Sequence, residues 1–134
     1  MGPYMSKVSM TIFGEPCSKA NSRRLVTSKL GRPMFIKSKK ALDYVKSFEK
    51  QCKRLDPLLE DDVAVTIKIY YASRRPDLDE SLILDCMQGL VYKNDRQVKV
   101  KHVYWGGVDK ESPRSEISVE NLQDGLREGH KSSD

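Results

Sequence analysis

The sequence has few cysteines and histidines. Its three cysteines, Cys17, Cys52 and Cys86, are odd in number, lie far apart and form no Cys-x-x-Cys pair. This pattern excludes a disulfide framework and a structural zinc site. The two histidines, His102 and His130, are also far apart, with no Cys or His beside either one, which argues against a histidine-based metal site.

Long apolar segments and the common catalytic motifs are also absent. No segment approaches the roughly 20 apolar residues that a membrane span needs, and residues 1–11 are too polar for a signal peptide. The chain contains no glycine-rich phosphate loop, no Gly-x-Ser-x-Gly elbow and no Ser/His or Cys/His constellation. We therefore expect a cytoplasmic protein with no membrane partner.

The chain is rich in charge, which is unevenly distributed. Its 134 residues, 38% hydrophobic and 32% charged, suffice for one folded domain and are too few for two. The net charge is +5, but Ser18–Arg54 holds twelve Lys or Arg and two acidic residues, a net +10 that leaves the rest at −5. Such a segment is typical of a protein that binds a phosphate backbone, or of a solvated helix face. The basic residues continue into the loop before the predicted helix, which favours binding.

The hydrophobic pattern predicts a single α+β domain over residues 8–123, with a mixed sheet packed against two main helices. Residues 1–7 are interpreted as an extension that could include residues added for expression, and residues 124–134 as a disordered tail. The predicted strands are Val8–Phe13, Val63–Tyr71, Gln97–Trp105 and Glu116–Glu120, with a short hairpin formed by Leu25–Val26 and Met34–Ile36. The predicted helices are Ser38–Arg54 and Glu80–Gln88. The predicted core includes Ile67, Ile69, Leu42, Val45, Phe48, Leu82 and Val98.

An acidic pair lies where the strand Val63–Tyr71 gives way to a helix. In an extended backbone, the carboxylates of Asp77 and Asp79 project to the same side and could share one divalent ion. Paired hard oxygen ligands suit Mg²⁺, which can activate a water for attack on phosphorus. The alternative is a turn in which Asp79 caps the helix. Asp95 is a third candidate, or an ordinary residue of an Asn-Asp turn.

The order of these motifs resembles the RusA-like Holliday junction resolvases. Pro76–Asp79, a helix containing Asp85, and Gly89–Val98 are similar to that family's signature of Pro-Asp-x-Asp-Asn, a helix Asp, a Gly and Asp-Asp-x-Gln-Val. Gly14–Pro16 and the basic residues after it resemble the family's opening strand and loop. The resemblance covers residues 8–120, and its specificity lies in the ordered combination.

This resemblance implies a homodimeric, Mg²⁺-dependent endodeoxyribonuclease of bacterial or phage origin that cuts opposed strands of a four-way DNA junction, with Mn²⁺ as a substitute metal. Asp77, Asp79 and Asp95 match the family's metal-binding carboxylates. Asp85 matches the helix Asp, as a ligand or a neighbour of the ligands, and Glu80 is a further candidate ligand. The residues expected to contact DNA are Lys19, Arg23, Arg24, Arg74, Arg75 and Lys93.

The sequence also departs from the family pattern. Glu80 replaces the usual Asn, and Asn94 replaces the first Asp of the usual Asp-Asp pair. The family's helix Lys would fall on Ile83 or in a gap. The positive charge that this Lys would supply could instead come from Lys19, Lys93, Arg74 or Arg75. A branched-DNA-binding protein with little or no cleavage activity is therefore the alternative function, and a basic structural protein is a third.

Assembly follows from the expected reaction. Symmetric cutting of two strands needs two active sites, and the chain carries one set of carboxylates, so a C2 homodimer is expected. The outward-facing residues of Gln97–Trp105 or of the first strand are the candidate interface. Tyr70, Tyr92 and Trp105 are candidate wedges that could open the junction centre.

Overall fold

The computed structural model describes residues 7–18 and 21–122. A four-stranded sheet has the order β1-β6-β4-β5, in which β4 and β5 are parallel and the other neighbours antiparallel, and a separate hairpin pairs β2 with β3. The elements are β1 (Lys7–Phe13), β2 (Arg23–Thr27), β3 (Pro33–Lys37), α1 (Lys39–Gln51), β4 (Val63–Tyr71), α2 (Ser81–Met87), the short 3₁₀ helix η2 (Asp95–Gln97), β5 (Val98–Val108) and β6 (Arg114–Asn121). This arrangement confirms the predicted α+β class.

The central strand β4 forms because its apolar residues alternate. Val63, Val65, Ile67, Ile69 and Tyr71 are all buried, and the residues between them are more exposed. Residues with a spacing of two lie on one face of a strand, so this pattern builds one apolar face. The predicted bounds of this strand are confirmed.

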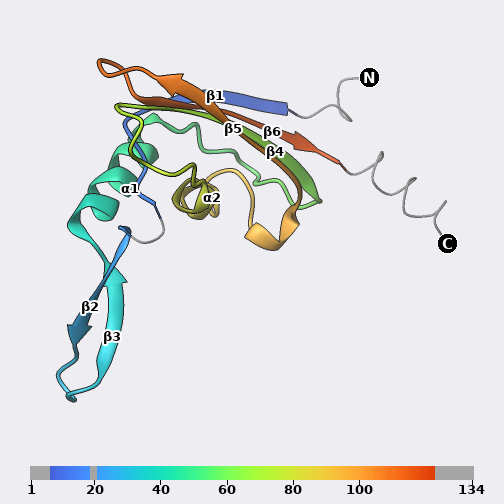
Figure 1. Ribbon diagram of the computed structural model, residues 1–134. Helices are drawn as coiled ribbons and strands as arrows, with labels where there is room; N and C mark the ends of the chain where they lie inside the picture. The colour runs from blue at the N-terminus through green and yellow to red at the C-terminus, as the bar shows by residue number, and fades with distance from the viewer. Residues whose placement is uncertain (1–6, 19–20, 123–134) are drawn as a thin grey trace, which may run out of the picture.

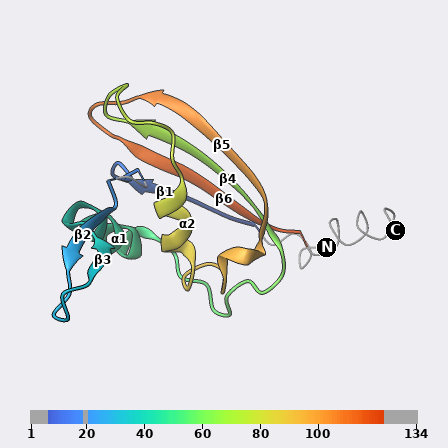
Figure 2. The same ribbon diagram turned by 60° about the horizontal axis from the view of Figure 1, so that its bottom comes forward.

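Both helices cover that apolar face, and no helix of the described ranges covers the other (Figures 1 and 2). The predicted helix starting after Ser38 is confirmed, since the Ala41 N–H donates to Ser38 Oγ at 3.2 Å. The helix ends at Gln51 rather than Arg54, because Cys52 already has an extended backbone.

The stripe by which α1 packs differs from the predicted one. Ala41, Tyr44 and Phe48 face the core, and Val45 is only partly buried. Leu42 is 46% exposed, so its assignment to the core was wrong. Successive residues in a helix are rotated by about 100°, so a face centred on Tyr44 turns Leu42 towards solvent. Burying the larger aromatic ring removes more apolar area from water.

Helix α2 and the C-terminal strands largely follow the predictions. Leu82 and Ile83 of α2 are buried and Val98 is partly buried. Gln97 belongs to η2 instead of a strand, and β5 continues to Val108. The predicted tail lies outside the described residues, as does the predicted N-terminal extension except Lys7, which begins β1.

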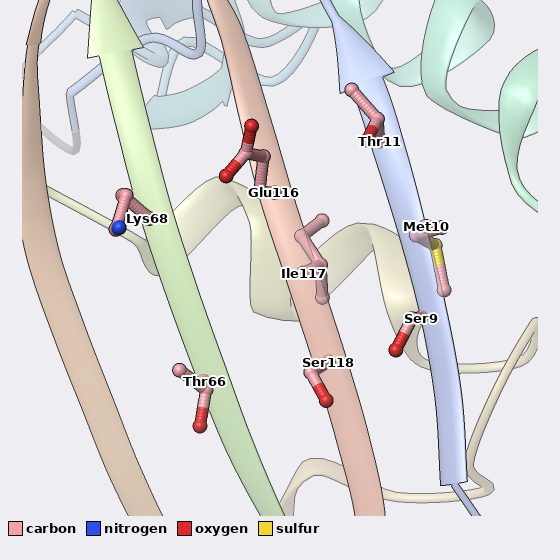
Figure 3. A pocket seen from close by; sticks show the side chains of 8 residues that line it. All are labelled: Ser9, Met10, Thr11, Thr66, Lys68, Glu116, Ile117 and Ser118. Carbon is pink, nitrogen blue, oxygen red and sulfur yellow. The ribbon is translucent and has the colours of Figure 1, made fainter.

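Part of the uncovered face of the sheet carries polar side chains. Figure 3 shows Ser9 and Thr11 of β1, Thr66 and Lys68 of β4 and Glu116 among the side chains that line a hollow of about 620 Å³ on this face. Among the helices that the structure describes, none is long and apolar enough to cross a membrane.

Candidate active site

The loop that carries the acidic pair is held by the last residue of β4. Tyr71 Oη donates to the carbonyl oxygen of Asp77 at 3.1 Å, and the Asp79 N–H donates to the same Oη at 3.2 Å. The Tyr71 ring is 1% exposed and stacks on Trp105 of β5, with ring centroids 5.0 Å apart. Burial raises the pKa of Tyr71, so the hydroxyl keeps the proton that it donates. The hydroxyl of one buried tyrosine therefore binds the backbone of both Asp77 and Asp79.

The two carboxylates of this loop lie in different surroundings. Asp77 is exposed, and Asp79 is half-buried. Asp79 Oδ1 accepts from the N–H of Ser81, the first residue of α2, at 2.9 Å, which closes a turn just before the helix, whereas the N-cap position itself is occupied by Glu80. This turn holds Asp79 just before α2, two residues from Asp77.

Glu80 and Glu15 add negative charge beside the same loop. Glu80 forms an ion pair with Lys101 of β5 at 2.6 Å, and its side chain is only 18% exposed. Glu15 Oε2 accepts from the N–H of Ala72 at 2.8 Å and so ties the start of the basic loop to the end of β4. This contact was not predicted, although the Gly14–Pro16 tripeptide was noted.

Asp95 is presented by a hydrogen-bonded turn. The Asn94 side chain accepts from the N–H of Arg96, and the Gln97 side chain accepts from the N–H of Asn94, which together form a capping box. The Gln97 amide also donates to two carbonyl groups of the loop before β4, at 2.8 Å each. This capping box was not predicted, although the three-residue spacing of Asn94 and Gln97 is its sequence pattern.

Asp85 and Asp95 lie around a second buried phenol. Tyr92 is fully buried, and its hydroxyl donates to the carbonyl oxygen of Leu84 at 2.8 Å. Burial raises the pKa of Tyr92, and the negative charges of Asp95 and Asp85 raise it further. Both carboxylates therefore lie within electrostatic reach of the Tyr92 hydroxyl. The Asp95 N–H also donates to the side chain of Gln88, the residue that follows α2, at 2.9 Å.

The carboxylates thus form two groups, one near Tyr71 and one near Tyr92. Within residues 7–18 and 21–122, no three acidic, His or Cys side chains come together as a ligand set for a metal ion. Carboxylate oxygens are nevertheless the donors that Mg²⁺ prefers, so the donor chemistry fits this metal. The structure places the predicted ligands along α2 and the two segments that flank it.

The predicted DNA contacts lie in several places. Arg23 and Arg24 are exposed on β2, and Arg74 and Arg75 are exposed on the loop after β4. The chain between Arg23 and Lys37 forms a hairpin that projects from the body of the protein (Figures 1 and 2). Lys19 lies outside the described residues. Lys93 forms an ion pair with Glu60 at 3.0 Å.

The candidate aromatic wedges are engaged in packing. Tyr92 is fully buried, so its assignment as a wedge was wrong. Tyr70 lies under the Arg114 guanidinium, 4.0 Å from the ring centroid. Its ring also covers Gly106, where an added Cβ would lie 2.8 Å from the ring. Trp105 stacks on Tyr71, so replacing it would also disturb the ring that supports the acidic loop.

Comparison with known proteins assigns a family to this arrangement. A search of curated proteins found no match. The family model for the endodeoxyribonuclease RusA matches residues 14–120, a range that contains all the described candidate ligands and the basic hairpin. The chain therefore belongs to the RusA family of Holliday junction resolving endodeoxyribonucleases.

Proposed function

We propose that the protein is a Mg²⁺-dependent, structure-specific endodeoxyribonuclease that resolves four-way DNA junctions by paired phosphodiester hydrolysis. The observation that supports this most directly is the acidic loop after β4, where Tyr71 brackets Asp77 and Asp79 by two hydrogen bonds. A buried, hydrogen-bonded support suits a metal site, because the backbone that carries the ligands must be held in place.

In this proposal, Asp77, Asp79 and Asp95 hold the metal, and Asp85 lies beside them. Bound Mg²⁺, or Mn²⁺ in its place, supplies Lewis acidity and lowers the pKa of a coordinated water. The ligands belong to separate groups in the structure, so metal binding requires side-chain rotation that brings them together. Glu80 would contribute only after release from Lys101, so it is the weakest candidate ligand.

The basic hairpin is proposed to bind the DNA backbone. Its sequence from Arg23 to Lys37 contains five Lys or Arg and no acidic residue. Phosphate neutralisation by such an arm gives affinity without sequence preference, which suits a protein that reads the shape of a junction. Arg74 and Arg75 would extend this surface past the acidic loop.

We also propose that the active form is a homodimer, since paired cuts need two sites. The first strand and the segment around Gln97–Trp105 were the candidate interfaces. In the described sheet, β1 and β5 are the two edge strands, whose outer backbone groups could pair with a second copy. Sedimentation at micromolar concentration should show a dimer. A strict monomer that makes paired cuts would contradict this assembly.

The test of the activity is cleavage of an end-labelled synthetic four-way junction in Mg²⁺, in Mn²⁺ and in EDTA. The expected result is two symmetric cuts that require the metal, with junction binding in all three conditions. The separate carboxylate groups favour one alternative, a branched-DNA-binding protein with little or no activity. Binding without cleavage in either metal would establish that alternative.

A further inference from the structure

A small polar pocket lies where the base of the β2–β3 hairpin meets α2. Its volume is about 140 Å³, several times the ~30 Å³ that one water occupies in the liquid. The residues that line it are Ser22, Arg23, Lys37, Ser81, Leu82 and Asp85. Arg23 and Lys37 are opposite one another in the hairpin register, so two cations form one wall.

The hairpin wall is anchored to the body of the protein. The Ser38 N–H donates to the carbonyl oxygen of Ser22 at 3.0 Å, and Ser38 Oγ donates to the carbonyl oxygen of Asn21 at 2.8 Å. Ser38 is also the N-cap of α1. The backbone that carries Arg23 and Lys37 therefore has a defined position at this end of the hairpin.

The other wall adjoins the acidic loop. Ser81 lines the pocket, and its N–H donates to Asp79 Oδ1. Asp85 lies one helical turn further along α2. Helix α2 contains no Lys or Arg, and Ile83 is fully buried, so the helix cannot supply a cation from that position. The cations nearest to this part of α2 in the pocket come from the hairpin.

The charges in the pocket favour an anion. Two cations face one carboxylate, and within the described part of the chain neither Arg23 nor Lys37 forms an ion pair with an acidic side chain.

We propose that this pocket binds one phosphate of the DNA backbone, with Arg23 and Lys37 donating to its oxygens. A guanidinium presents a fork of donors that matches phosphate, and an ammonium adds a compact charge. The proposal rests on DNA being the substrate and deepens that function, because it assigns one phosphate to a defined site beside the acidic loop. Lys37 and Arg23 then supply the positive charge that α2 lacks.

The test measures binding one phosphate at a time. Four-way junctions that carry a single neutral methylphosphonate are titrated by fluorescence anisotropy in EDTA, so that no cleavage occurs. For the unaltered protein, a methylphosphonate at one phosphate position, or at its symmetry equivalent in the junction, should lower the affinity by about tenfold. This is the loss expected for a charged hydrogen bond. Lys37→Gln and Arg23→Gln should bind more weakly overall and show a much smaller loss at that position, and Lys37→Arg should restore it.

Arg32→Gln is the matched control, since Arg32 lies near the turn of the same hairpin and does not line the pocket. It removes the same charge and should keep the full loss at that position. The pocket proposal is wrong if the loss of affinity at each methylphosphonate position is the same in all three variants, Lys37→Gln, Arg23→Gln and Arg32→Gln, as in the unaltered protein. Cleavage in Mg²⁺ is scored separately. If the protein cuts but the pocket variants keep the loss at that position, the nuclease assignment stands and the pocket proposal fails. If the pocket variants remove the loss but the protein does not cut, the pocket proposal stands and the nuclease assignment fails.

Discussion

Replacing Tyr71 by phenylalanine removes one oxygen and, with it, both hydrogen bonds that bracket the acidic loop. The ring, its burial and its stacking on Trp105 are retained. Each lost hydrogen bond costs about 0.5 to 1.5 kcal/mol net, so the loss of both should lower the free energy of unfolding by about 1 to 3 kcal/mol. For a domain of this size each kcal/mol lowers the melting temperature by about 3 to 5 °C, so it should fall by about 3 to 15 °C. Because the carboxylates lose their support, cleavage should slow by about a hundredfold.

Tyr70→Phe is the control for this change. It also removes one phenol oxygen and keeps its ring, with the Arg114 contact and the packing over Gly106. Calorimetry gives the melting temperatures, and single-turnover cleavage at saturating protein separates catalysis from binding. Junction affinity in EDTA should be unchanged in both variants. If Tyr71→Phe cleaves and melts like the unaltered protein, the hydroxyl does not position the acidic loop.

Three further predictions concern metal binding, DNA affinity and alkaline stability. Asp79→Asn and Asp95→Asn should abolish cleavage and retain or improve junction binding, since each loses a charged ligand and repels phosphate less; full activity of both in the gel assay would contradict the ligand assignment. If about six phosphates are neutralised, junction affinity should fall by about three decades between 50 and 200 mM salt, and an anisotropy titration that shows no salt dependence would contradict backbone binding. Burial raises the pKa of Cys86 from 9.0 to about 12, so the folded state keeps a proton that the unfolded chain releases. This contribution to the free energy of unfolding is fully present below about pH 9 and is lost as pH rises towards 12. Measured by denaturation, the free energy of unfolding of the Cys86→Ala variant should decline less steeply with pH over that range than that of the unaltered protein. Identical slopes would contradict the raised pKa of Cys86.

The sequence alone was sufficient where the determining interactions are local. The alternation of Val63–Tyr71 defined a strand with the bounds that the structure has. Ser38 marked the start of α1, because its hydroxyl accepts a backbone N–H only three residues away. The motif order also indicated the family, which the family match over residues 14–120 confirms. The roles of Asp77, Asp79 and Asp95 stay predictions.

The tertiary structure decided which residues meet. From the sequence, Leu42 was placed on the buried face of α1 and Tyr44 was not named, and the sheet against which the helix packs selects Tyr44. In the sequence Tyr71 was only the last residue of the predicted strand Val63–Tyr71, since its bonds to the acidic loop depend on how that loop folds back over the strand end.

The same distinction applies to the cations. In the sequence, Lys37 is one of twelve basic residues between Ser18 and Arg54, and no spacing relates it to Asp85. Because the hairpin packs beside α2, Lys37 and Asp85 line the same pocket. A periodic pattern determines the faces of each strand and helix because those faces repeat along the chain. Contacts between distant segments depend on how the elements pack, and that packing exists only in the folded protein.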